Sequence, residues 1–180
     1  MQEFLTGKSN PPILTPMLET DEHSPRLIGF REWVSLPDLN LPAIKAKVDT
    51  GAKTSSLHAY DIEVMDKGGK SYVHFKVHPL QHDFSVVIKC RALLVDQREV
   101  TDSGGHKETR YVIQTTMVLS GLKKQIELTL TNRQEMKFRM LIGRGALRHY
   151  HIDPISSYLA GKTIKQKRFL RELREKMRKL

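Results

Sequence analysis

The chain has 180 residues, of which 39% are hydrophobic and 28% are charged, and these proportions suit one globular domain while excluding a disordered or fibrous protein. Its longest apolar run, at residues 92–95, is far shorter than the roughly 20 residues of a membrane-spanning helix. One cysteine, Cys90, excludes an internal disulfide and a multi-cysteine zinc site, and no secretory signal is recognisable, so we expect a cytoplasmic protein.

The predicted elements begin after an N-terminal arm. Residues 1–25 contain four prolines and no hydrophobic periodicity, which predicts an extended arm. Residues 26–160 are mostly β in pattern, because apolar and polar residues alternate or β-rich runs recur between turn signals. This pattern predicts strands at 44–48, 62–64, 73–77, 84–95, 110–119 and 125–130, with a turn at 66–69. Before the C-terminal segment, a helical pattern is confined to 145–150, so an all-β fold is expected.

Asp49 stands where the first of these strands ends. The strand leads directly into Thr50 and Gly51, followed by Ala52. Glycine permits a tight turn and the threonine hydroxyl can hold it, so the aspartate is presented by a rigid scaffold. Taken alone, this triplet is better explained as an ordinary turn at a strand end.

A second motif, Met140 to Gly143 followed by Arg144, reads as an apolar strand that ends in glycine 94 residues after Asp49. The two motifs, together with GFREWV at 29–34 and RYVI at 110–113, resemble those of the bacterial retropepsin-like aspartic endopeptidases. That family is also called ATP-dependent zinc proteases, or the RimK/LysX family. The resemblance runs from about residue 27 to residue 158.

The resemblance implies a retropepsin-like acid-protease closed barrel with a flap hairpin, and the predicted hairpin Val100–His106 lies in the matching place. The implied catalytic residues are Asp49, Thr50 and Gly51, supported by Ala52, Gly143 and Arg144. The implied flap, which contacts substrate, contains Ser103, Gly104 and Gly105.

Aspartic proteolysis needs two carboxylates that share one proton. The chain offers one convincing Asp-Thr-Gly and is too short for a two-lobed enzyme, so we predict a homodimer in which each subunit contributes Asp49. Asp102, in Asp-Ser-Gly, is the alternative second carboxylate within one chain. Polar residues precede it and no second apolar strand supports it, so a hairpin tip is the preferred interpretation.

The aspartic mechanism requires no cofactor, although the family's other name suggests zinc and ATP. The sequence contains no His-Glu-x-x-His, and the segment 156–163 begins with serine where a phosphate loop has glycine, which argues against ATP. His58 is the best candidate for zinc binding or substrate contact, with a hydrogen-bonded turn histidine as the favoured interpretation. His74, His78 and His82 are expected on a polar outer strand face.

Lys53 follows the Asp-Thr-Gly-Ala motif, and a cation near the mouth of the site would favour acidic peptides such as oligoglutamate. The sequence therefore predicts an aspartic peptidase that acts on peptides or proteins. A zinc-dependent hydrolase and a non-catalytic peptide-binding module are the alternatives.

The formal net charge of +10 is concentrated at the C-terminus. Residues 162–180 contain nine Lys or Arg and two Glu, which leaves only +3 for the rest of the chain. Four apolar residues recur there at helical spacing: Leu170, Leu173, Met177 and Leu180. The pattern predicts a basic amphipathic helix over 161–180 that docks through its apolar stripe. Nucleic acid or another anionic partner is the alternative use of its charge.

Overall fold

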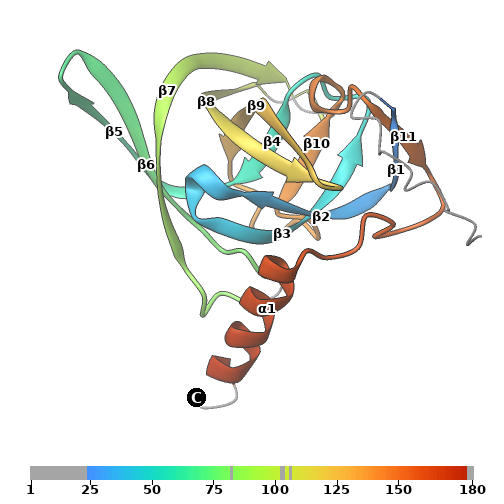
Figure 1. Cartoon of the computed structure of the whole chain (residues 1–180). Coiled ribbons are helices and arrows are strands. Elements are labelled where there is room, and N and C mark those ends of the chain that lie inside the picture. The colour runs from blue at the N-terminus through green and yellow to red at the C-terminus, as the bar shows by residue number, and fades with distance from the viewer. Residues whose placement is uncertain (1–23, 82, 102–103, 106, 178–180) are drawn as a thin grey trace, which may run out of the picture.

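A computed structural model describes residues 24–81, 83–101, 104–105 and 107–177 (Figure 1). Nearly all of the predicted N-terminal arm, and also Asp102, Ser103 and His82, lie outside the described residues. Within them, no helix is long and apolar enough to cross a membrane.

Strands make up most of the described chain, and the all-β prediction is confirmed. The strands are β1 (Arg26–Gly29), β2 (Arg31–Leu36), β3 (Leu41–Asp49), β4 (Ser55–His58), β5 (Tyr60–Lys67), β6 (Lys70–Val77), β7 (Ile88–Thr101), β8 (Lys107–Leu119), β9 (Leu122–Thr131), β10 (Met140–Gly143) and β11 (Tyr150–Asp153). Two 3-10 turns, η1 (Pro37–Leu39) and η2 (Arg144–Ala146), and the helix α1 (Ile164–Met177) complete the described elements.

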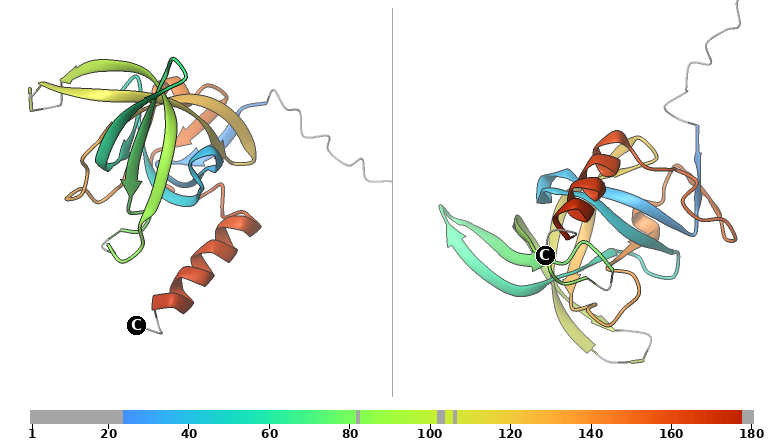
Figure 2. Two further views of the ribbon diagram at one scale, coloured as in Figure 1. Left: turned by 90° about the vertical axis from the view of Figure 1, so that its left-hand side faces the viewer. Right: turned by 90° about the horizontal axis from the view of Figure 1, so that it is seen from below.

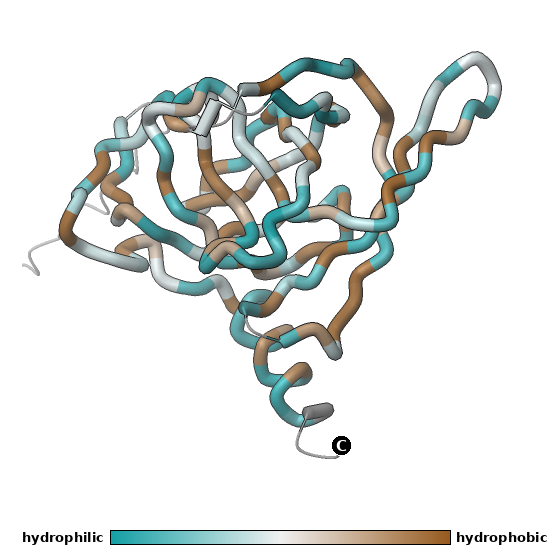
Figure 3. The backbone as a smooth tube through the Cα atoms, turned by 180° about the vertical axis from the view of Figure 1, so that it is seen from behind, coloured by the Kyte–Doolittle hydropathy of each residue, from teal (hydrophilic) through white to brown (hydrophobic). Residues whose placement is uncertain are grey.

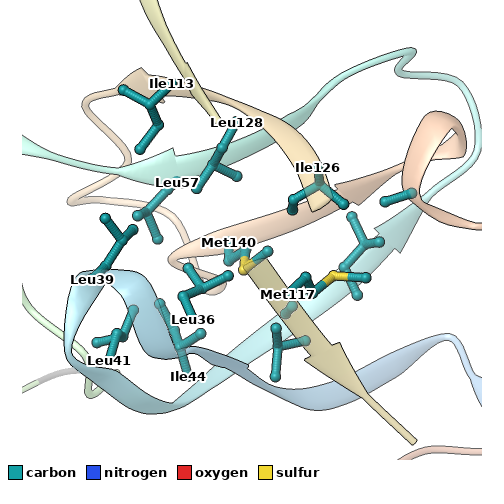
Figure 4. Close-up of a cluster of buried hydrophobic side chains, with 14 of the residues drawn as sticks. Leu36, Leu39, Leu41, Ile44, Leu57, Ile113, Met117, Ile126, Leu128 and Met140 are labelled. Atoms are coloured by element: carbon teal, nitrogen blue, oxygen red, sulfur yellow. The ribbon is translucent and has the colours of Figure 1, made fainter. Parts of the chain in front are cut away.

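The main sheet closes on itself. Its order is β2-β3-β10-β4-β9-β8-β7-β6-β5, and a further pairing of Ser35 with Val118 joins β2 to β8. Six of the strands therefore form a ring, while β1 and β11 pair in parallel beside it. Apolar side chains from β2, β3, β4, β8, β9 and β10 fill the ring and make its core (Figure 4).

The β5–β6 hairpin projects from the ring, as Figures 1 and 2 show. Its turn lies where the sequence predicted it, with Gly68 and Gly69 at φ values of 60° and 71°. Glycine suits these left-handed conformations because it carries no Cβ. Near this tip Val64 and Met65 are 42% and 53% exposed, so the core does not extend to the end of the hairpin.

Two sequence-based boundaries were wrong. The strand expected at 84–95 begins only at Ile88, because residues 83–87 form an irregular connection that leads into β7. The helix expected at 145–150 is reduced to η2. The chain cannot continue as a helix because His149 has a left-handed φ of 72° and Tyr150 already begins β11, which pairs with Arg26 of β1.

The C-terminal helix begins with a capping box. The backbone N–H of Gln166 donates to the Thr163 hydroxyl oxygen at 3.2 Å, and the Gln166 side-chain oxygen accepts from the Thr163 N–H at 2.9 Å. Leu173 is 6% exposed, whereas most of the basic side chains of α1 are exposed. Viewed from behind, the helix alternates hydrophilic and hydrophobic residues along its length (Figure 3). It therefore packs onto the domain through the half-buried Leu170 and the buried Leu173 of the predicted stripe, whereas Leu180 and the other residues after Met177 lie outside the described residues.

Candidate active site

Asp49 is the last residue of β3, and its carboxylate is held by the turn that follows. Its Oδ1 accepts the backbone N–H groups of Gly51 and Ala52 at 3.1 and 3.2 Å. The side chain stays partly exposed, and Thr50 and Gly51 are exposed at the rim of the loop. Two backbone donors therefore fix the orientation of a carboxylate that solvent and a substrate can still reach.

The strand β10 supports this loop from beside β3. The two strands run parallel, with Gly143 opposite Asp49. The Gly143 N–H donates to the Ser55 hydroxyl at 3.1 Å. A Cβ on Gly143 would lie 2.6 Å from the carbonyl carbon of Thr54, so only glycine allows this approach. The two motifs, far apart in the sequence, thus form one structural unit.

Arg144 ties the end of β10 to the Asp49 loop. Its Nη1 donates to the Gly51 carbonyl at 2.9 Å, and its backbone N–H donates to the Ala52 carbonyl at 2.9 Å. The loop that presents Asp49 is therefore held on both of its sides. These contacts place Ala52, Gly143 and Arg144 against the Asp49 loop, and their supporting role in the site stays a prediction.

A cavity of about 350 Å³ opens beside Asp49 on the outer side of β3 and β10. Eight residues line it: Lys47, Val48, Asp49, Arg133, Met136, Lys137, Phe138 and Leu141. Burial lowers the pKa of the Arg133 guanidinium, Arg110 lowers it further, and the nearby Asp49 carboxylate opposes both effects. The Asp49 carboxylate therefore lies at the edge of a pocket that Lys47, Arg133 and Lys137 make positively charged.

The sequence did not identify Arg133 or Lys137. Both belong to the loop between β9 and β10, which carries no motif, and they reach Asp49 only through the fold. The charged composition of that loop, residues 132–137, was the one available signal.

The predicted flap is the end of the β7–β8 hairpin. The strands pair from Leu94 with Ile113 out to Thr101 with Lys107. Gly104 and Gly105 are exposed at the tip, and Gly105 has a φ of 82°, while Ser103 lies outside the described residues. An ion pair between Glu99 and Lys107 at 2.8 Å joins the two strands just below the tip.

His58 ends β4 inside the protein and is fully buried. Its Nδ1 accepts the backbone N–H of Arg133 at 3.0 Å, so the proton of the neutral ring sits on Nε2. Burial is the main cause that lowers the pKa of His58 to about 4, helped by Arg139, His78 and Arg133. These contacts favour the hydrogen-bonded structural interpretation over contact with substrate or zinc.

The expectation that His78 lies on a polar outer face was wrong. His78 is 7% exposed, because the rings of His58, Tyr60 and Phe84 pack against its imidazole after β6 ends. Its ring stacks on Tyr60 at 4.5 Å between centroids, and its Nε2 lies 3.0 Å from the Tyr60 hydroxyl. Among the described residues, no group of three or more His, Cys, Asp or Glu side chains is arranged to hold a metal ion.

Lys53 is exposed on the Asp49 loop, as a residue near the mouth of a site would be. Its positive charge lies near Glu127 of β9. The hydrogen bond from Arg98 is the main cause that lowers the pKa of the Glu127 carboxyl, and the charge of Lys53 lowers it further. Lys53 thus adds a cation on the Asp49 loop to the pocket's own Lys47, Arg133 and Lys137.

Comparison with known proteins identifies the family. The model of the RimB-like family, described as retropepsin-like aspartic endopeptidase RimB, matches residues 27–163. The chain belongs to this family. The RimB-like match contains both motifs, the β7–β8 hairpin and the loop with Arg133.

The RimB-like segment also occurs in longer proteins. This chain is 45% identical over 142 residues to a probable alpha-L-glutamate ligase of Desulfotalea psychrophila, covering 78% of this chain and 31% of that protein. It is 48% identical over 136 residues to one of Parasynechococcus marenigrum, covering 75% and 29%. The chain therefore spans about a third of the length of these curated relatives.

A crystal structure of a Legionella pneumophila protein of unknown function has a similar fold. It aligns with a TM-score of 0.64 and 28% identity, covering 75% of this chain and 98% of that one. The aligned region therefore makes up nearly the whole of the Legionella chain.

Proposed function

We propose that this RimB-like chain is an aspartic peptidase whose catalytic dyad consists of Asp49 and the partner's Asp49 in a homodimer. The observation that carries the proposal is the Asp49 carboxylate, held by two backbone N–H groups at a strand end and supported by Gly143 of β10. A rigid, partly exposed carboxylate of this kind is suited to meet a second one across a two-fold axis.

In the proposed reaction, one Asp49 carboxylate accepts a proton from water while the water oxygen attacks the scissile carbonyl carbon. The other Asp49, protonated, donates its proton to the carbonyl oxygen, which gives a tetrahedral gem-diol. Transfer of a proton to the amide nitrogen then breaks the C–N bond and releases an amine and a carboxylic acid.

The proposed substrates are acidic peptides, including oligoglutamate. Lys47, Arg133 and Lys137 line the pocket at Asp49, and Lys53 lies on its loop. These cations complement side-chain carboxylates. The relatives named alpha-L-glutamate ligases support the same chemistry, since a retropepsin-like segment is joined there to a protein named for attaching glutamate.

The test is hydrolysis of an oligoglutamate peptide by purified protein carrying Asp49→Asn. This change preserves the shape of the side chain and removes its acid–base function, so we expect at least a thousandfold loss of kcat. The matched control is Asp66→Asn, on the exposed β5–β6 hairpin, which should keep full activity. Undiminished hydrolysis by the Asp49→Asn protein would refute the aspartic mechanism.

Two further measurements separate the alternatives. A zinc-dependent hydrolase would lose activity with a chelator and contain stoichiometric zinc, whereas the aspartic peptidase should do neither. A non-catalytic module would bind the peptide as a monomer and leave it intact.

A further inference from the structure

A second group of cations gathers on the face of β2 and β3, around the only tryptophan of the chain. Trp33 on β2 pairs with Lys45 on β3 across the sheet. The Nζ atoms of Lys45 and Lys162 each lie 5.3 Å from the centre of the indole ring. Tyr158 packs against the same indole with 6.2 Å between ring centroids. An aromatic floor thus carries two ammonium groups.

Arg31 adds a third cation to this floor. Its guanidinium lies 5.4 Å from the centre of the Tyr158 ring, and its Nε donates to the Ser157 hydroxyl at 2.8 Å. We call this group the aromatic–basic cluster; its members are Arg31, Trp33, Lys45, Tyr158 and Lys162.

No salt bridge of the described residues includes Arg31, Lys45 or Lys162. Burial lowers the pKa of the Lys45 ammonium, and the charges of Arg31 and Lys162 lower it further. Like charges held together with no salt-bridge partner are unfavourable, and an anion that binds between them would relieve the repulsion.

The cluster continues to the candidate active site along β3. Ile44 and Ala46 point into the core, whereas Lys45, Lys47 and Asp49 alternate with them and face outward. Lys47 lines the Asp49 pocket, and Arg31 of the cluster pairs with Lys47 across β2 and β3. Because a strand rises about 3.3 Å per residue, Lys45 and Asp49 are separated by about 13 Å of strand, the reach of about four extended residues.

At its other side the cluster borders a cavity under α1. This cavity, of about 360 Å³, is lined by Trp33 and Lys45, by Leu170, Leu173 and Arg174 of α1, and by Pro79, Leu80, Gln81 and Asp83. The Asp83 carboxylate is hydrogen-bonded to the backbone N–H and hydroxyl of Ser85 and, among the described residues, forms no salt bridge with the cluster. Figures 1 and 2 show α1 projecting away from the ring of strands below β3, on the side where the segment between β6 and β7 lies. The basic helix thereby extends the positive surface beyond the cluster.

We propose that the aromatic–basic cluster is an anchoring site for acidic polypeptide, which holds the carboxylates of a segment about four residues away from the bond cleaved at Asp49. The proposal rests on the proposed peptidase function. The cluster is continuous with the Asp49 pocket through Lys47, and the distance between them fits a few residues of an extended peptide. This favours a polypeptide over RNA, because an RNA ligand would not have to reach Asp49.

Binding is measured separately from cleavage by using protein that carries Asp49→Asn. The fluorescence of Trp33 is followed while a ten-residue oligoglutamate peptide is added. We expect a saturable change of emission that weakens as salt is added. Adding the double change Lys45→Gln/Lys162→Gln to this protein should raise the Kd for the peptide about tenfold or more. The control Lys67→Gln/Lys70→Gln removes the same charge from the exposed β5–β6 hairpin and should leave Kd unchanged.

Lys162→Gln alone, at an exposed position before α1, guards against a folding effect and should raise the Kd by a smaller factor. An unchanged Kd in both lysine variants would overturn the cluster as an anchoring site, even if Asp49 proves essential for hydrolysis.

Full hydrolysis with Asp49→Asn would overturn the peptidase proposal, while weaker peptide binding in the double variant would still support the cluster. Tighter binding of a ten-nucleotide single-stranded RNA than of the peptide, lost in the double variant, would overturn the assignment of a polypeptide.

Discussion

At the scale of single residues, burial decides which polar groups work in the candidate site and which hold the fold. Asp49 and His58 lie nine residues apart in the sequence. The first is partly exposed with its carboxylate held by turn N–H groups, whereas the second is fully buried and accepts a backbone hydrogen bond. A fully buried imidazole that accepts at Nδ1 is kept neutral, because protonation would destroy that bond and place a charge in the core.

His58 therefore predicts a loss of stability at acidic pH. The histidine titrates near pH 6.5 in the unfolded chain and near pH 4 in the folded one. Its contribution is complete above pH 6.5 and is lost as the pH falls toward 4, because only the unfolded state then binds the proton. The loss amounts to up to about 3 kcal/mol of unfolding free energy. Urea denaturation at pH 7, 5.5 and 4 measures it.

His58→Asn is the informative variant for this prediction. The asparagine side-chain oxygen still accepts the Arg133 N–H, but the group does not titrate. We expect lower stability at pH 7 and a flatter dependence on pH between 6.5 and 4. An equally steep dependence in the variant would mean that other groups, such as the buried His78, cause the acid loss.

At the scale of elements, the site depends on how closely β10 approaches the loop after β3. The approach takes place at Gly143, where an added Cβ would lie 2.6 Å and 2.7 Å from the carbonyl carbon and oxygen of Thr54. These are backbone atoms, which cannot rotate away as the end of a flexible side chain can. The spacing of β3, β4 and β10 is thus set by the absence of one side chain.

Gly143→Ala should therefore lower the unfolding free energy by about 2–3 kcal/mol and displace the Asp49 loop. Gly145→Ala is the comparison, because its Cβ would meet a single atom, the Lys53 carbonyl oxygen, at 3.1 Å. We expect it to lose clearly less stability in thermal and urea denaturation. Equal losses in the two variants would show that the close approach at Gly143 is not what limits the packing.

At the scale of the whole molecule, the described chain presents one Asp-Thr-Gly loop, and the proposed dyad needs a second copy. Half of the catalytic carboxylates then come from each subunit, so activity must follow the dimer and not the monomer. The fold leaves the Asp49 loop exposed, and the β7–β8 hairpin ends in exposed glycines, as such a shared site requires.

Mixing experiments test this dependence directly. Excess Asp49→Asn protein, equilibrated with the wild-type protein, should suppress its hydrolysis of oligoglutamate because mixed dimers lack one carboxylate. The same excess of Asp66→Asn protein should not suppress it. Specific activity should also fall on dilution, in step with dissociation observed by sedimentation. Activity that is independent of concentration and of the inactive variant would contradict a shared dyad.

The sequence by itself determined the features that arise locally. Alternating apolar residues predicted most strands, helical spacing predicted α1, and the Asp-Thr-Gly turn located Asp49, because each signal lies within a few neighbouring residues. The helix expected at 145–150 failed because Tyr150 belongs to β11, which pairs with Arg26 of β1 far away in the sequence. Local periodicity carries no information about such distant partners.

Only the tertiary structure decided what surrounds Asp49 and which polar groups are buried. Arg133 reaches the site from a loop without a motif, and His78 turns into the interior after its strand ends. Arg31, Lys45 and Lys162 meet although more than a hundred residues separate the first from the last. Burial and long-range electrostatics depend on how strands pack, so the chemistry of the pocket and of the aromatic–basic cluster emerged only when the ring closed.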